Sequence, residues 1–255
     1  MLNVIFAYDD LVDVPYTVET TEKQRANETV YDDVLWHTPK KDMVLFDSRS
    51  TTAHENIHMI SSHLRQLYSK RGKINGFYLL DNKALILKQP KITISQAASY
   101  VPKNLRGSRF DVYFKRQSKY WDSEPLYIIE EHLGYVTGGM CAVNDYVNGK
   151  STEDNTDVCS AAMEFIAYST AVAMCVKDKD PDYWDREDDF IALLYYLNNT
   201  SSGLFTQSRE IPQLYFESAE KHFDKLINSE EGKTIISFIQ QELEPRKKYS
   251  LVPSE

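Results

Sequence analysis

The sequence predicts an α+β fold in which a small N-terminal and central sheet packs on a mainly helical body. Short apolar runs bounded by turn residues are common in the first half of the chain, and long apolar runs at helical spacing follow Pro125. A third observation is one helix of unusual composition, residues 48–68, which we expect within the sheet-containing first part. The length of 255 residues suits one large domain or two closely packed ones, with a core that needs no disulfide.

The strands are predicted from short apolar, β-branched or aromatic runs. Two of these runs, Phe77 to Leu80 and Ala84 to Leu87, are separated by Asp81-Asn82-Lys83, which is the spacing and turn chemistry of a hairpin. The run at 43–46 is compact and leads directly into the 48–68 helix. The full set of strand candidates is 2–8, 16–19, 30–36, 43–46, 77–80, 84–87, 91–95 and 109–114.

The second half of the chain is predicted to be helical, beginning with Pro125, a residue that suits a first helical turn. We expect helices over 125–145, 158–176, 190–198, 211–227 and 232–243. The 158–176 helix contains Glu164, Ser160, Ser169 and Thr170, so it is interpreted as a buried helix and not as a membrane span. The predicted organisation is a sheet-containing part (1–124), a helical part (125–245) and a tail (246–255), with the first two forming one compact unit.

Composition and charge exclude several classes of function. The net charge of −9 argues against a nucleic-acid partner, because phosphate binding needs an excess of Lys and Arg. Three cysteines without a C-x-x-C give neither a disulfide framework nor a thiolate zinc site. Residues 1–8 lack the basic region of a signal peptide, so we expect a protein that is cytoplasmic or exported without a cleavable signal.

The most informative feature is the pentapeptide His54-Glu55-Asn56-Ile57-His58, which has the pattern H-E-x-x-H. On a helix, positions i and i+4 share one face, so His54 and His58 can bind one metal ion. Zinc would lower the pKa of a bound water toward neutrality, and Glu55 would take the proton of that water. This is the chemistry of a zinc-dependent hydrolase, with a peptide or protein as the first choice of substrate.

The setting of the pentapeptide favours a metal site over two surface histidines. Ser50, Thr51 and Thr52 are candidate N-caps, and Ile57, Ile60 and Leu64 recur at helical spacing on a buried face. The residues around the two histidines are uncharged, as expected of a helix that packs inside a cleft. They are Thr52, Ala53, Asn56, Ile57 and Met59.

A catalytic zinc ion usually has three protein ligands, so a third ligand is needed. His63 lies on another face of the helix, and no third histidine follows at close spacing, which leaves carboxylates. Glu131 and Glu164 are the candidates. Glu164 is conspicuous because no other charge lies between 157 and 177, whereas Glu131 is followed by Gly134 and Gly138-Gly139, which allow close packing on the 48–68 helix. We favour Glu131 and expect Glu164 to accept a hydrogen bond from a ligand imidazole.

Both glutamates have the form E-x-x-small-Tyr, and here the chain resembles the gluzincin branch of the zincin metallopeptidases. The resemblance covers the pentapeptide and one short helix. It implies a zinc cofactor, a zincin-like active-site helix, and a glutamate on a later helix as the third ligand after His54 and His58. Glu55 would be the general base, and Tyr135 or Tyr168, one turn from the two glutamates, would donate a hydrogen bond to the oxyanion.

Two other functions remain open on the sequence. One is a non-catalytic binding or interaction protein on a zincin-like scaffold, in which the metal is structural or absent. The other is an exported effector protease, with which the polar tail after Ser229 is compatible. A metal-free chain whose thermal stability is unchanged in chelator would support the first, and translocation of a reporter fused to the tail would distinguish the second from a housekeeping enzyme.

Overall fold

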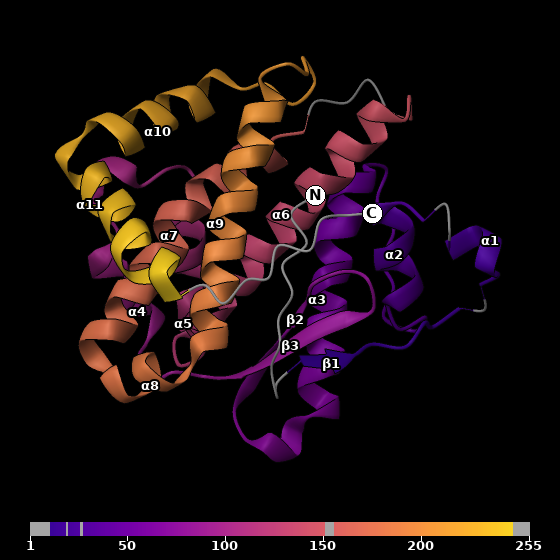
Figure 1. The fold of residues 1–255 in the computed structure, drawn as a ribbon, viewed down its shortest axis with the longest axis horizontal. Coiled ribbons are helices and arrows are strands. Elements are labelled where there is room, and N and C mark those ends of the chain that lie inside the picture. The colour runs from indigo at the N-terminus through magenta and orange to yellow at the C-terminus, as the bar shows by residue number, and fades with distance from the viewer. Residues whose placement is uncertain (1–10, 19, 26–27, 151–155, 247–255) are drawn as a thin grey trace.

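The computed structural model describes residues 11–18, 20–25, 28–150 and 156–246, and it has the predicted mainly helical α+β fold (Figure 1). A three-stranded antiparallel sheet has the order β1-β3-β2, so β3 pairs with both neighbours. The strands are β1 (Leu11–Asp13), β2 (Ile74–Tyr78) and β3 (Lys83–Lys88). The helices are α1 (Glu22–Arg25), α2 (Val30–His37), α3 (Arg49–Leu67), α4 (Ile94–Ala97), α5 (Ser118–Trp121), α6 (Leu126–Val147), α7 (Val158–Lys179), α8 (Pro181–Arg186), α9 (Asp188–Ser208), α10 (Glu217–Asn228) and α11 (Glu230–Phe238), with π-helical turns at Asp111–Arg116 and Ile239–Leu243.

Helix α3 lies at the centre of the arrangement, because it packs against β2 on one side and along α6 on the other (Figure 1). Helices α7 and α9 pack against α6 and against each other. One continuous cluster of buried side chains joins the parts before and after Pro125, with Ile57 and Leu85 in the first and Leu133 and Phe165 in the second. The candidate histidines therefore lie on a helix that is held from both sides by the core.

The predicted hairpin is confirmed as β2 and β3, paired with Phe77 opposite Leu85. Three consecutive residues of its turn, Leu80, Asp81 and Asn82, have positive φ values of 70°, 50° and 62°. Asp and Asn tolerate this left-handed region better than most residues, which explains why the turn occurs at this point of the sequence. The turn also supplies Asn82, whose side chain binds His37 of α2.

Helix α7 is buried, as the sequence predicted. By length and composition it could cross a membrane, but 94% of its most apolar window lies inside the structure. Burial of this kind is typical of the central helix of a packed core.

Several strand predictions are wrong. Residues 30–36 belong to α2, which begins with a capping box in which Thr29 binds the Asp32 amide and the Asp32 side chain binds the Thr29 amide. Segment 91–95 leads into α4, segment 109–114 enters a π-helical turn, and 16–18 form no strand, whereas β1 was not expected. The candidate strand at 2–8, Glu19 and residues 247–255 of the tail lie outside the described residues.

The segment 43–46 is also not a strand, although its backbone is held in a related way. The amide and carbonyl of Val44 bond to the side-chain amide of Asn56 at 3.2 and 2.7 Å, and those of Phe46 bond to the hydroxyl of Thr52 at 2.9 and 3.2 Å. Side chains of α3 thus take the place of a neighbouring strand. Because Asn56 and Thr52 are used on this face of α3, the segment that precedes the helix is fixed to it.

The boundaries of the two most important helices follow the prediction closely. Helix α3 begins after Ser48, whose hydroxyl accepts a hydrogen bond from the Thr51 amide, so Ser48 is the N-cap and not Ser50, Thr51 or Thr52. Helix α6 begins directly after Pro125. Correct starting points for both helices place His54, His58 and Glu131 at their expected positions within them.

Candidate metal centre

Three side chains from α3 and α6 meet in one small cluster. His54 and His58 of α3 approach each other with 3.2 Å between their Nε2 atoms. Glu131 of α6 points its Oε2 between them, 3.6 Å from each Nε2 atom. The three side chains are only 8%, 14% and 5% exposed, respectively. Two imidazole nitrogens and one carboxylate oxygen therefore converge in a nearly buried position.

The spacing of these three atoms fits a single zinc ion. Ligand atoms bound tetrahedrally at about 2.0–2.2 Å from zinc lie about 3.3–3.6 Å apart. The observed separations of 3.2, 3.6 and 3.6 Å fall close to this range. They are too long for Glu131 to accept ordinary hydrogen bonds, and its buried Oε2 has no hydrogen-bond partner among the described residues. An unsatisfied buried carboxylate oxygen is costly, and a cation bound there would remove that cost.

Glu130, the neighbour of Glu131, fixes the orientation of His58. Its Oε1 lies 2.8 Å from His58 Nδ1, and its Oε2 accepts a short hydrogen bond from Arg65, which also binds Asn75 at 2.6 Å. A carboxylate accepts hydrogen bonds, so Nδ1 of His58 carries a proton and the Nε2 of a neutral ring presents its lone pair to the cluster.

The charges of the cluster shift the pKa values of its members in the directions that burial and neighbours dictate. Burial favours neutral His58, but the carboxylates of Glu131 and Glu130 outweigh it and raise its pKa to about 10. Burial likewise raises the pKa of Glu131, but His58 and His54 hold it well below its ordinary value. The metal-free cluster is therefore an ion pair, and a metal ion that binds there must displace a proton from His58.

The close approach of α6 to α3 depends on glycines, as the sequence predicted. A Cβ at Gly134 would lie 3.0–3.2 Å from atoms of the His54 ring, and one at Gly138 would lie 2.9 Å from the carbonyl oxygen of Ser50. Gly139 instead faces Leu204 and Cys159. Gly134 and Gly138 thus give His54 and the first turn of α3 the space they occupy against α6.

Helix α6 is also held in place on the face that packs against α7 and α9. His132, next to Glu131, is fully buried, and its ring nitrogens contact the hydroxyls of Ser169 at 3.0 Å and Ser201 at 2.8 Å. Burial lowers the pKa of His132 to about 3, so its ring is neutral. This histidine ties three helices together and plays no part in the cluster.

Tyrosines form the wall around Glu131. The ring of Tyr135 meets His54 edge-on at 4.4 Å between centroids, and its hydroxyl lies 2.9 Å from that of Tyr113. Tyr127 stacks on Trp121 at 4.9 Å. Burial raises the pKa of Tyr113 and of Tyr127, and the negative charge of Glu131 raises both further. These phenols therefore keep their protons and can act as hydrogen-bond donors.

Glu55 is half-buried on α3, between the two histidines. Its negative charge contributes to the raised pKa of Tyr127, after burial and the charges of Glu131 and Glu130. The pentapeptide brings its two histidines together, as the helical spacing requires.

The expectation that Glu164 binds a ligand imidazole is wrong. The carboxylate of Glu164 accepts hydrogen bonds from the Tyr168 hydroxyl at 3.1 Å and from the Arg109 amide at 3.2 Å. Its Oε1 also lies 3.4 Å from Nη1 of Arg109. Tyr168 donates to Glu164 and accepts from the Gly107 amide, so it is not directed at the histidines. The expected role of Glu164 is filled by Glu130.

Sequence reasoning missed Glu130, Arg65, Tyr113 and Tyr127. A signal existed for two of them. Glu130 is a second charge in an otherwise apolar part of α6, and Tyr127 precedes Glu131 by four residues, which is the same helical face. Tyr113 and Arg65 come from segments whose relation to α6 only the tertiary structure reveals.

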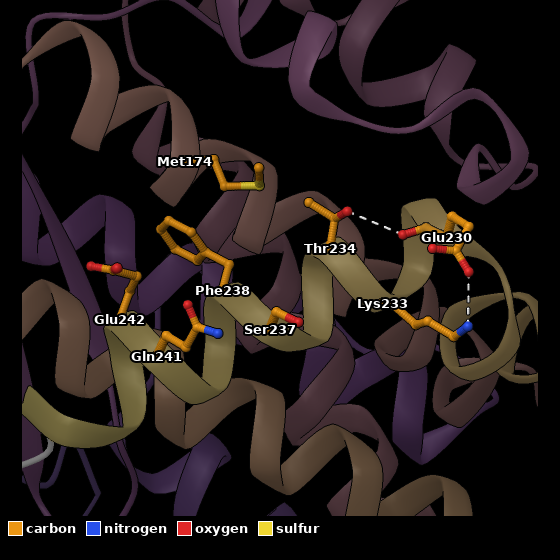
Figure 2. A pocket seen from close by; sticks show the side chains of 8 residues that line it. All are labelled: Met174, Glu230, Lys233, Thr234, Ser237, Phe238, Gln241 and Glu242. Atoms are coloured by element: carbon orange, nitrogen blue, oxygen red, sulfur yellow. Dashed lines mark hydrogen bonds and ion pairs between the residues drawn. The ribbon is translucent and has the colours of Figure 1, made fainter.

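A separate pocket is lined mainly by α11 and the π-helical turn that follows it (Figure 2). Its only residue outside α11 and the turn after it is Met174 of α7, and one of its charged pairs, Glu230 with Lys233 at 2.8 Å, is already formed. None of the site residues predicted from the sequence lies there. The lining consists of Met174, Glu230, Lys233, Thr234, Ser237, Phe238, Gln241 and Glu242.

Comparisons of the chain with models of protein families, with curated proteins and with solved structures found no match.

Proposed function

We propose that this protein is a zinc-dependent hydrolase of the gluzincin type, and that its reaction is the cleavage of peptide bonds. The observation that carries this proposal is the triangle formed by Nε2 of His54, Nε2 of His58 and Oε2 of Glu131, with sides of 3.2–3.6 Å. His54, His58 and Glu131 would hold the zinc ion. The orienting contact from Glu130 to His58 supports the assignment, because ligand imidazoles usually carry such a partner.

The side chains around the triangle would divide the chemistry among them. When bound, zinc would acidify a water molecule and polarise the carbonyl of the peptide bond. Glu55 would accept the proton of the attacking water and later deliver it to the leaving amine nitrogen. Tyr135 would donate a hydrogen bond to the oxygen that becomes negatively charged. The low exposure of the site would strengthen each of these interactions, since little water competes with them.

The test is the substitution Glu55→Gln. Protein purified without chelator should contain close to one zinc ion per chain, and the variant should retain that zinc, because Glu55 is not a ligand. Hydrolysis of a denatured protein substrate should fall by about 10²–10⁴-fold, which is typical for the loss of a general base. Glu124→Gln, the same change at the half-buried partner of Lys73, is the matched control and should leave hydrolysis unchanged.

Two results would contradict the proposed roles. Loss of zinc from the Glu55→Gln variant would make Glu55 a ligand, and full activity in that variant would remove it from the chemistry. A chain that binds no zinc at all would remove the proposal altogether.

A second candidate function is a binding protein whose metal is structural. The observation that favours it is the low exposure of the three ligand side chains, none above 14%, because structural zinc sites are closed whereas catalytic ones keep an open position. Chelation would then lower the unfolding temperature, and the metal-loaded protein would hydrolyse no peptide. Hydrolysis that depends on Glu55 would exclude this alternative.

A further inference from the structure

A short loop before the π-helical turn is clamped by Glu164. The Glu164 carboxylate accepts hydrogen bonds from the Arg109 amide at 3.2 Å and from the Ser108 hydroxyl at 3.3 Å. Gly107 lies so close that a Cβ there would come within 2.3–2.5 Å of this carboxylate. Tyr168, which binds both Glu164 and the Gly107 amide, closes the clamp. The buried helix α7 thus fixes the backbone from which Arg109 extends.

The side chain of Arg109 reaches from this loop to the candidate site. Its guanidinium carbon lies 5.1 Å from the ring centroid of Tyr135, within the range of a cation–π contact. Its position is set by two carboxylates, Asp157 at 2.5 Å and Glu164 at 3.4 Å, and the side chain is 14% exposed. A planar guanidinium that is paired on its edge and stacked on its face has little freedom to move.

Tyr135 in turn is held between Arg109 and the metal cluster. Its ring meets the ring of His54 edge-on at 4.4 Å and an interplanar angle of 67°. Its hydroxyl is directed at Tyr113, 2.9 Å away. A displacement of the guanidinium would therefore shift the ring of Tyr135, which contacts the proposed zinc ligand His54.

We propose that Glu164, acting through Arg109, is a positioning residue for Tyr135. The catalytic meaning of this inference rests on the proposed function, in which Tyr135 donates a hydrogen bond to the oxyanion. The contacts that carry it form one continuous path from α7 to α6: carboxylate to guanidinium, guanidinium to phenol ring, and ring to imidazole. Glu164 serves the site from a distance and not as a zinc ligand.

The direct test uses the ¹⁹F resonance of Tyr135 in protein labelled with 3-fluorotyrosine. The Tyr135→Phe variant identifies the signal among those of the seventeen tyrosines. Glu164→Gln should shift the Tyr135 signal although Glu164 does not contact that ring. In an Arg109→Gln background the same Glu164 substitution should cause no further shift, because the connecting residue is gone. Arg109→Lys, which keeps the charge without the planar fork, replaces Arg109→Gln if the latter does not fold.

The matched control is Arg209→Gln. Arg209 also pairs with a glutamate, Glu220, and lies over a phenyl ring, that of Phe205, and none of these three residues belongs to the metal cluster. It should leave the Tyr135 signal in place. A Glu164→Gln shift of equal size with and without Arg109, or no shift in either background, would overturn the positioning role.

A second readout separates this inference from the proposed function. With a peptide that the protein hydrolyses, Glu164→Gln should lower kcat by about tenfold and leave KM nearly unchanged, since small misplacements of catalytic groups cost about this much or more. In the Tyr135→Phe background it should have no further effect, and an equal tenfold loss there would overturn the role. If the protein hydrolyses no peptide, the proposed function fails, while the ¹⁹F shifts still decide whether Glu164 positions Tyr135.

Discussion

Among the described residues, two clusters of side chains could hold a metal ion, and they differ in what those side chains already do. His54, His58 and Glu131 form one, and Glu28, Asp33 and His37 form the other. In both, one potential ligand atom from each residue lies within 4.8 Å of the others. Proximity alone therefore does not separate the two clusters, although the first offers two imidazoles and one carboxylate and the second offers one imidazole and two carboxylates.

In the second cluster, His37 and Asp33 already take part in a hydrogen-bond network, although the buried Oε1 of Glu28 has no partner among the described residues. Nδ1 of His37 lies 2.7 Å from the Asp33 carbonyl and 2.7 Å from the Tyr78 hydroxyl, and its Nε2 lies 2.6 Å from Oδ1 of Asn82. Asp33 accepts hydrogen bonds from Tyr78 and from the Asp81 amide. A metal ion could bind His37 only by breaking one of these contacts, of which those to Tyr78, Asn82 and Asp81 fix α2 to the β2–β3 hairpin.

The first cluster leaves its inward-facing atoms available. The orienting contact to His58 is made at Nδ1, on the outer edge of the ring, and Oε2 of Glu131 has no hydrogen-bond partner in the described part of the chain. The comparison teaches that proximity of histidines and carboxylates does not define a metal site. What distinguishes the two clusters is that both ring nitrogens of His37 already have partners, whereas Nε2 of His54 and Nε2 of His58 contact each other inside the cluster.

The largest expected difference is in zinc binding after His→Ala substitutions. His58→Ala should weaken zinc binding by about 10³-fold or more, because it removes a ligand. Loss of a residue that only hydrogen-bonds a ligand costs less, about 10–100-fold. His37→Ala should leave zinc affinity unchanged. Competition with a chromophoric chelator measures both values.

Stability measured without metal should fall in both variants, because His58 belongs to a buried ion pair in the metal-free cluster. His37→Ala breaks a buried network and should lower the free energy of unfolding by about 3 kcal/mol in urea titrations. If His37→Ala releases zinc and His58→Ala retains it, the two clusters have been assigned the wrong way round.

A smaller effect is expected from the residue that orients a ligand. Glu130→Gln should reduce zinc affinity by about 10–100-fold, because His58 loses the carboxylate that holds its proton at Nδ1. Glu28→Gln, the same change in the second cluster, is the control and should leave zinc affinity as it is. An unchanged affinity in the Glu130 variant would mean that His58 is held in place by packing alone.

The parts of the fold that could be predicted from sequence are those whose signal extends over many residues. Helices α3, α6 and α7 have long apolar faces, and the hairpin has a recognisable turn, so local periodicity was sufficient. Short runs failed because a few apolar residues fit a strand or a helix equally well. The run 30–36 is a helix because Thr29 and Asp32 cap it and because Asp33 and His37 bind the hairpin, a contact between distant segments.

The candidate site likewise has a part that local sequence predicts and a part that depends on tertiary packing. The i and i+4 spacing of His54 and His58 is a local property, and it placed the two nitrogens together. The identity of the third side chain depends on how α6 is rotated against α3, which Gly134 and Gly138 determine through contacts with His54 and Ser50. Adjacent residues on a helix point about 100° apart, so one rotation gives Glu131 to the cluster and Glu130 to the outer edge of His58.

The smallest predicted effect concerns pH and belongs to the second cluster. Burial, and after it the charge of Asp33, raises the pKa of Glu28 from 4.5 to about 7. Below pH 4.5 this carboxyl is protonated in both folded and unfolded protein; between 4.5 and about 7 only the unfolded chain loses the proton, so the free energy of unfolding falls as pH rises.

Glu28→Gln should remove this fall. Relative to wild type, it should gain about 1 kcal/mol between about pH 4.5 and pH 8, less than the full shift implies, because Glu28 is partly exposed and screened. Urea unfolding at both pH values measures the gain, with Glu124→Gln as control, and equal pH dependence in wild type and the Glu28 variant would show that Glu28 ionises freely in the folded protein.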